Sequence, residues 1–512
     1  MSRMGISTVL FRNTHAIGSC AKISSKRLKD ASYHFASIKS QSGIFVPFPR
    51  GRHPGSSIFQ SAPQGRAFQL DSLISAGHHL WRDKSAPVPE TLAQALLLSP
   101  LSNPPTPASV PLVKLRRLPE DFQVTEQNRL PIGSDGPYAA YRLTKTSWTT
   151  LDALSRCSRT LNLPRRNFQH GGLKDRHAVT SQVITIRNGP RRDHVEDPIS
   201  LTYLGQSLRP VQADDVVGNT FRIVARSLSE EERAASEQAL PSVQQAGIPN
   251  YFDDQRFGSY FPGHGFIAEY WIREDYETAL QLCFAEPERH DSPAEREQKA
   301  ILREHWDRWP ECKAALERSH RRSIITFLAD RPGDFKGAWA RVNADLRGLY
   351  LSALQSHLWN QVTSDLLELE VPSKQRTAVQ LRPGPVWFPN QLSAPQSQRY
   401  RDLLLPLPSS RLKALTPEIQ ERINESLARC GWSLPQLKVK FPRDRFFSRS
   451  SRKVLVGVDD LAWEFADDEL SPGNSKVTLT LTLPRGAYAT MLIKRLFQTL
   501  SEEDLTNDAD VD

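Results

Sequence analysis

The chain reads Gly171-Gly172-Leu173-Lys174-Asp175-Arg176-His177-Ala178-Val179-Thr180-Ser181-Gln182 through a glycine-flanked loop, and Val183-Ile184-Thr185-Ile186 directly after it. The β-branched run predicts a strand. The loop places one carboxylate, Asp175, between two cations. Further along, Asn250-Tyr251-Phe252-Asp253-Asp254-Gln255-Arg256-Phe257-Gly258 combines aromatic with basic side chains. Together these segments indicate carboxylate chemistry on a nucleic-acid base.

Length and composition set broad limits on the protein class. A chain of 512 residues exceeds the size of one hydrophobic core, which predicts two domains with flanking segments. Lys and Arg number 66 against 57 Asp and Glu, so the net charge of +9 favours polyanionic partners. The five cysteines form no C-x-x-C pair, and this argues against structural zinc and for a reducing compartment. No apolar run approaches the roughly 18 residues of a membrane span, so we expect a soluble protein.

The two ends of the chain differ from the rest. Residues 1–107 are rich in Ser, Gly, His and Pro, and no acid precedes Asp30. A basic, acid-free start resembles a mitochondrial transit peptide. We favour instead a disordered extension that ends in a proline-rich linker, and therefore a cytoplasmic protein, with a mitochondrial location as the alternative. The acidic residues 501–512 predict a disordered tail.

Hydrophobic periodicity predicts an α+β protein. We expect strands at 122–126, 183–186 and 220–226 and, most clearly, at 477–483, where Val and Leu alternate with Thr. We expect helices after Thr149, with Leu151, Leu154, Cys157 and Leu161 on one face, at 294–303, at 346–362 with Leu346 and Leu349 in its apolar stripe, and from Pro417 toward Gly431. Sheet-forming sequence on both sides of a helical block predicts an inserted domain. The expected division is 108–272 and 448–500 for one domain and 273–447 for the insertion.

Four separated motifs then give a family resemblance. Leu118-Pro119-Glu120-Asp121-Phe122, the loop at 171–182, the segment at 250–258 and Leu483-Pro484-Arg485-Gly486-Ala487-Tyr488-Ala489-Thr490 occur in this order. The combination resembles the TruD family of tRNA pseudouridine synthases, from roughly Val113 to Phe497. The resemblance implies a pseudouridine synthase catalytic domain on a mixed β-sheet, with an inserted, mostly helical TruD-specific domain.

The same resemblance implies an isomerase that acts on tRNA. Conversion of uridine to pseudouridine breaks the C1′–N1 bond, turns the base and joins C1′ to C5, so no atom is gained. Neither a cofactor nor a metal is therefore implied. For bacterial members the implied target is uridine 13 in the D arm. We expect tRNA as the partner, no membrane association and a monomer.

Asp175 is the catalytic carboxylate that the resemblance implies. It can act as a nucleophile or as a base, and the sequence leaves both roles open. Lys174 and Arg176 are expected to support it by favouring its charged form. The sequence does not show which cation pairs with it.

The resemblance also implies the residues that hold the target nucleotide. These are Phe122, Asn250, Phe252 and Tyr488, with Phe252 as the ring that stacks on the flipped base. Gln255 and Arg256 are expected to support the site by hydrogen bonds to phosphate or to the catalytic loop.

Three positions depart from the family pattern, and several functions stay open. Asp253 stands where glycine is usual, which restricts the backbone and adds an acid beside an RNA site. Arg116 and Arg485 stand where lysine is common. A non-catalytic RNA-binding protein on the same scaffold, for which Asp253 is the supporting feature, is one alternative. A synthase for another RNA is a second, and a glycoside or nucleoside hydrolase with two paired acids is a third.

Overall fold

The computed structural model describes residues 113–288, 291–412, 415–439, 447–497 and 499–500. The expected N-terminal extension and acidic tail, 1–107 and 501–512, lie outside the described residues. All of the described residues belong to one compact unit. Within these ranges, no helix combines the length and the apolar character needed to cross a membrane.

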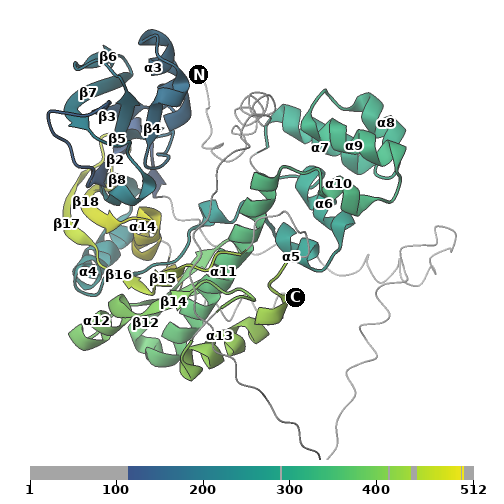
Figure 1. The fold of residues 1–512 in the computed structure, drawn as a ribbon. Coiled ribbons are helices and arrows are strands. Elements are labelled where there is room, and N and C mark those ends of the chain that lie inside the picture. The colour runs from purple at the N-terminus through teal and green to yellow at the C-terminus, as the bar shows by residue number, and fades with distance from the viewer. Residues whose placement is uncertain (1–112, 289–290, 413–414, 440–446, 498, 501–512) are drawn as a thin grey trace, which may run out of the picture. The chain divides into compact units, whose positions relative to one another are not determined.

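A ten-stranded mixed sheet is the largest β-structure (Figure 1). Its order is β17-β18-β8-β2-β5-β3-β7-β6, with β1 paired to β8 and β4 to β5. Strands β2 and β5 are parallel, whereas β18 pairs antiparallel with β8. The bounds are β1 (Lys114–Leu115), β2 (Phe122–Asn128), β3 (Tyr138–Thr146), β4 (Phe168–His170), β5 (Val179–Arg187), β6 (His194–Glu196), β7 (Ile199–Ser207), β8 (Val216–Leu228), β17 (Asp459–Asp467) and β18 (Ser475–Pro484). The sheet thus joins two segments far apart in the chain, and the expected mixed-sheet fold is confirmed.

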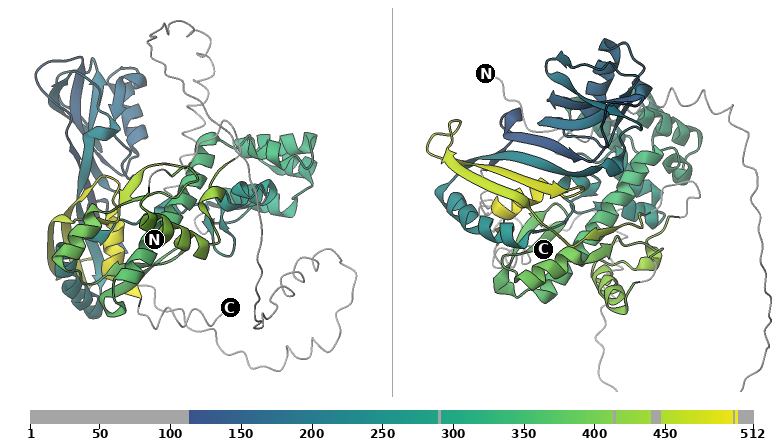
Figure 2. Two further views of the ribbon diagram at one scale, coloured as in Figure 1. Left: turned by 60° about the horizontal axis from the view of Figure 1, so that its bottom comes forward. Right: turned by 60° about the vertical axis from the view of Figure 1, so that its left-hand side comes forward.

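Strand β18 shows why the sheet is covered on one side. Its Val and Leu residues are fully buried and alternate with half-buried threonines. Helices α4 (Glu230–Ala246) and α14 (Ala489–Phe497) contribute to the same core, and α14 contacts α4 (Figure 2). Full burial of each such side chain contributes roughly 1.5–3 kcal/mol. The alternation predicted from sequence is confirmed.

A second core lies under α3 (Thr150–Thr160). The Thr149 hydroxyl caps this helix by accepting from the Asp152 backbone N–H, as its position before the apolar stripe predicted. Leu154 and Cys157 are buried against β3, β4 and β5. Leu151 is exposed, so its place in the stripe was wrong; Thr150 and Ala153 are buried instead.

Residues between the two parts of the sheet are mostly helical. The helices are α5 (Ile267–Ile272), α6 (Tyr276–Phe284), α7 (Pro293–Glu304), α8 (Trp309–Ala315), α9 (His320–Asp330), α10 (Phe335–Trp339), α11 (Ala344–Glu370), α12 (Ala394–Asp402) and α13 (Pro417–Arg429). Leu349 of α11 is exposed, contrary to the predicted stripe, while Leu346 packs on the core. The domain boundaries stay a prediction.

Short strands accompany these helices. They are β9 (Ile248–Pro249) with β16 (Leu455–Val456), β10 (Tyr260–Phe261) with β11 (Gly265–Phe266), β14 (Leu404–Pro406) with β15 (Ser451–Lys453), and β12 (Arg376–Leu381) between β13 (Gly384–Pro389) and β19 (Thr499–Leu500). The β9–β16 pair matters for function, because it positions the segment after Pro249 beside the segment before Leu455.

Candidate functional site

A pocket of about 230 Å³ lies beside β2 and β8 of the large sheet. Residues of all four separated sequence motifs line it. Arg116 and Phe122 come from the start of the described chain, Asp175 comes from the loop between β4 and β5, and Gln255 and Tyr488 come from later segments. The structure therefore brings together Asp175 and four of the other predicted site residues, Phe122, Lys174, Gln255 and Tyr488.

Asp175 pairs with Arg116. Arg116 Nη2 donates to Asp175 Oδ2 at 2.8 Å, and both side chains are about one-third exposed, at 28% and 32%. The Arg116 guanidinium carbon also lies 4.2 Å from the centre of the Phe122 ring. The cation that faces the carboxylate thus comes from a distant segment and is held over an aromatic face.

The cations that flank Asp175 in the sequence are not its ion-pair partner. Lys174 Nζ lies 2.8 Å from Glu126 Oε2 and donates to Asn219 Oδ1 at 2.7 Å. The Glu126 side chain is fully buried, so Lys174 neutralises a carboxylate inside the sheet. Arg176 has no hydrogen bond or ion pair within the described residues. The sequence left the ion-pair partner of Asp175 open, and in the structure that partner is Arg116. The supporting role of Lys174 and Arg176 stays a prediction.

Buried polar groups hold the backbone of this loop. The Lys174 N–H donates to Thr150 Oγ1 at 3.0 Å, and Gln182 Nε2 donates to the Gly172 carbonyl at 2.8 Å. Lys145 Nζ donates to the Asp175 carbonyl at 2.7 Å and to the Trp148 carbonyl at 2.6 Å. The Lys145 side chain has no solvent exposure. A buried cation therefore fixes the main chain of the candidate catalytic residue.

We expect Lys145→Met to lower the rate of the reaction at Asp175 by about 10²-fold, because a misplacement of roughly 1 Å has this effect on catalysis. The substitution leaves two carbonyl groups without their donor. The measurement is a single-turnover rate. Arg142→Met is the control, since Arg142 is exposed on the same strand. Equal rates for both variants would contradict this role.

Lys145 should also make the free energy of unfolding depend on pH. Burial lowers its pKa to about 8 from 10.5, although Asp175 opposes the shift. Between these pH values the unfolded chain binds a proton that the folded chain lacks, so this group increases stability as pH rises. The gap in unfolding free energy between wild type and Lys145→Met should therefore widen from about pH 8 upward. Denaturant titrations at several pH values would measure it.

A second pocket of about 410 Å³ contains the other predicted residues, Asn250, Phe252 and Arg256. Phe252 and Tyr488 connect the two pockets, since their ring centres are 6.3 Å apart. Asn360 of α11 clamps the Phe252 backbone by accepting from its N–H at 2.9 Å and donating to its carbonyl at 2.8 Å. These two hydrogen bonds fix the main chain that carries the Phe252 ring.

Arg452 of β15 was not among the site residues predicted from the sequence. Its guanidinium carbon lies 4.2 Å from the centre of the Phe252 ring, and its Nη2 donates to Asn250 Oδ1 at 2.6 Å. One face of the expected stacking ring is therefore occupied by a guanidinium. The run Arg449-Ser450-Ser451-Arg452-Lys453 could have indicated an anion-binding segment, but basic residues among serines are also typical of a solvated loop.

Asp253 turns into the protein rather than toward RNA. It is buried, lies 2.7 Å from Lys494 Nζ and accepts from Thr490 Oγ1 at 2.7 Å. Burial alone would raise its pKa, but Lys494 and Thr490 outweigh burial and lower it. Its φ of −91° is open to any residue, so the loss of glycine causes no strain. Asp253 therefore forms an ion pair inside the protein, which is the case that the sequence left open as an alternative to an acid facing RNA.

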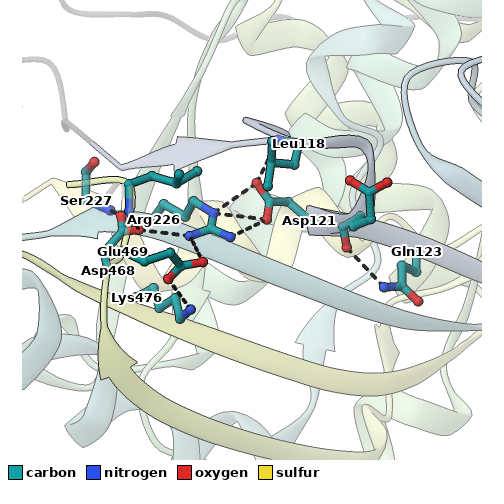
Figure 3. Close-up of polar contacts among 10 residues, drawn as sticks. Leu118, Asp121, Gln123, Arg226, Ser227, Asp468, Glu469 and Lys476 are labelled. Carbon is teal, nitrogen blue, oxygen red and sulfur yellow. Dashed lines mark hydrogen bonds and ion pairs between the residues drawn. The ribbon is translucent and has the colours of Figure 1, made fainter.

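A buried charge cluster lies next to the turn that precedes Phe122 (Figure 3). Arg226 of β8 donates through Nε to both Asp121 oxygens at 3.0 Å and through Nη1 to Asp468 Oδ1 at 2.8 Å. Asp121 ends the short turn between Arg116 and Phe122. The cluster thus ties the hairpin of β17 and β18 to the segment that supplies two pocket residues.

The part of the chain that matches known proteins includes the residues that line both pockets. A family model described as tRNA pseudouridine synthase D (TruD) matches residues 112–496. A protein of Methanocaldococcus jannaschii named "Probable tRNA pseudouridine synthase D 2" is 30% identical over 75% of this chain and 92% of its own length. The tRNA pseudouridine synthase D of Aquifex aeolicus is 27% identical over 75% and 98%, respectively. A crystal structure from Methanosarcina mazei, described as "Putative tRNA pseudouridine synthase D (TruD)", is 26% identical to this chain and has a TM-score of 0.60. The match covers 77% of this chain and 95% of that chain.

Proposed function

The chain belongs to the TruD family of tRNA pseudouridine synthases, and we propose that it converts one uridine of a tRNA to pseudouridine through the carboxylate of Asp175. The observation that carries this proposal is the pairing of Asp175 with Arg116 in a pocket lined by Phe122 and Tyr488. By the resemblance of the motifs, we propose uridine 13 of the D arm as the target.

The pocket supplies what the isomerisation requires. Arg116 places a positive charge 2.8 Å from the Asp175 carboxylate, the group that would act as a nucleophile or a base. Phe122 and Tyr488 offer aromatic surface to an extracted base, and stacking contributes roughly 1–3 kcal/mol per base. The C1′–N1 bond breaks, the base turns while it stays bound, and C1′ joins C5. The proton lost from C5 is balanced by the proton gained at N1.

The test is conversion of a tRNA transcript by the full chain without any added cofactor. If uridine carries tritium at C5, each turnover releases tritium, and mapping of pseudouridine in the product identifies the position. We expect stoichiometric release from one uridine of the D arm. Salt-sensitive tRNA binding without pseudouridine would favour the non-catalytic alternative, and release of free uracil would indicate a hydrolase. Pseudouridine found only in another RNA would support the proposed reaction but show that tRNA is not the substrate.

We further propose that the protein acts as a monomer in the cytoplasm. All cysteines within the described residues are free, which supports a reducing compartment. Fractionation of cells that express a tagged full chain would test the location, and mitochondrial enrichment would favour the transit-peptide alternative.

A further inference from the structure

The second pocket carries an unbalanced positive charge. Its lining includes Arg256, Arg452, Lys453 and Arg485, and no Asp or Glu. Arg485 has a partner outside the lining, because its Nη1 lies 3.1 Å from the exposed Asp214. The other three cations have no carboxylate partner within the described residues. A concave surface of this kind concentrates anions.

Arg452 is the clearest of these cations. Its Nε donates to the Asn250 carbonyl at 2.5 Å and its Nη2 donates to the Gly486 carbonyl at 2.8 Å, so its protein acceptors are neutral. Burial lowers its pKa to about 10, which leaves the group charged at neutral pH. A mostly buried guanidinium without an anion is costly, since burial removes water that the protein does not replace with charge. An anionic ligand would offset this cost.

Both arginines still have donors to offer. Arg256 uses Nε for Ser356 Oγ at 3.3 Å and Nη2 for Ser352 Oγ, and these acceptors are also neutral. No hydrogen bond within the described residues uses Nη1 of Arg256 or Nη1 of Arg452. Neither nitrogen is among the fully buried unpaired atoms, and both arginines line the pocket. Two guanidinium groups with free N–H bonds match the oxygens of a phosphate.

Lys453 and two serines complete the set. Lys453 is exposed on the rim and has no polar partner within the described ranges. Ser450 and Ser451 also line the pocket and are exposed. Hydroxyl groups, a point charge and two forked cations are the donors that proteins use for phosphate.

We propose that this pocket is a phosphate subsite that holds the RNA backbone next to the target uridine. The inference rests on the proposed function, because the ring contact between Phe252 and Tyr488 places the pocket beside the one that contains Asp175. A nucleotide whose base enters the Asp175 pocket brings its own phosphates with it. The subsite fixes the register of the RNA and carries no base specificity.

The phosphate subsite can be tested with tRNAs in which single phosphates are replaced by uncharged linkages. Methylphosphonates are placed singly at each phosphate of the D arm in a tRNA, and the Kd is measured for wild type, Arg256→Gln, Lys453→Gln and the control Lys374→Gln. Lys374 is exposed and lies outside both pockets. We expect one linkage to weaken binding to wild type and control by about tenfold, and to have less than about a twofold effect on the two pocket variants. Lys453→Gln should also reduce the slope of log K against log salt by about 0.7–0.9.

Lys453 keeps the test independent of folding, since the loss of an unpartnered surface amine removes no protein contact. Unfolding midpoints equal to that of wild type would verify this. A methylphosphonate effect that is the same in wild type and both pocket variants overturns the subsite. If inorganic phosphate raises the unfolding midpoint of wild type but not of the pocket variants, and no linkage shows coupling, the pocket binds free phosphate and the RNA proposal is wrong.

Binding and turnover separate the two proposals. The Kd measurements need no catalysis, so coupling between one linkage and Arg256 supports the subsite even if no pseudouridine forms. Pseudouridine formation with no such coupling removes the subsite and leaves the proposed function intact.

Discussion

Asp175→Asn is expected to reduce pseudouridine formation by at least about 10⁴-fold, because Asp175 is the only carboxylate among the described residues that line its pocket. The amide keeps the size of the side chain but can act neither as a nucleophile nor as a base. Binding of tRNA should change little, since the contacts that dominate RNA affinity are made by cations elsewhere. The measurement combines a single-turnover rate with a Kd for the same tRNA.

Glu120→Gln is the matched control for this loss. Glu120 is an exposed carboxylate of the turn before Phe122, and its substitution also removes one negative charge. We expect wild-type rates from it. Near-normal turnover by Asp175→Asn would show that Asp175 is not the catalytic residue, and the second pocket would then be the next candidate for the site of the reaction.

Arg116 gives a further check on the same mechanism. If Arg116 acts through Asp175, Arg116→Met lowers the reaction rate of the otherwise wild-type enzyme. It causes no further loss of rate when Asp175→Asn is already present, since residues that act as a unit have non-additive effects. Additive losses would mean that Arg116 serves the reaction independently of its 2.8 Å pair with Asp175.

The local patterns of the sequence predicted much of the fold. Alternation in β18, the Thr149 cap of α3 and the Pro417 start of α13 are each determined by neighbouring residues, and each was confirmed. Errors occurred at Leu151 and Leu349, which lie at helical spacing yet are exposed. Periodicity identifies the apolar face of a helix, but tertiary packing decides where that face ends.

The motifs predicted many of the pocket residues. They did not predict which of these side chains form ion pairs or hydrogen bonds with one another. Arg116 lies 59 positions before Asp175 in sequence, whereas the adjacent Lys174 pairs with Glu126. Lys145 stands between two threonines in a strand, a pattern typical of an exposed edge, yet it is fully buried. Such contacts depend on strand order and loop direction, which single-sequence patterns do not contain.

Arg226→Met is expected to lower the free energy of unfolding by about 3–5 kcal/mol, because removal of one member of a buried ion cluster leaves uncompensated charges. Asp121 and Asp468 are almost fully buried, and both would lose their guanidinium partner. Glu469 is half exposed and also pairs with Lys476, so it should contribute less. Denaturant unfolding monitored by intrinsic fluorescence would measure the loss.

A control and a pH titration separate this effect from general damage. Arg422→Met removes an exposed pair with Glu425 and should change stability by no more than about 1 kcal/mol. Burial would raise the pKa of Asp468, but backbone N–H groups and Arg226 lower it below 3.8. Its stabilisation is therefore present above pH 3.8 and lost as pH falls through the lowered pKa. The deficit of Arg226→Met should shrink in acid, where protonation removes the unpaired charges, and a deficit independent of pH would contradict the electrostatic explanation.

The same variant connects stability to the site. The turn that ends at Asp121 lies between Arg116 and Phe122, and its Leu118 N–H also donates to Asp121 at 2.9 Å (Figure 3). Loss of Arg226 should therefore loosen the cation that faces Asp175, and turnover should fall even at temperatures where the variant remains folded. Arg226→Lys keeps the charge but loses the forked geometry that reaches Asp121 and Asp468 together. We expect it to recover stability only in part, and full recovery of both stability and turnover would show that charge alone is sufficient.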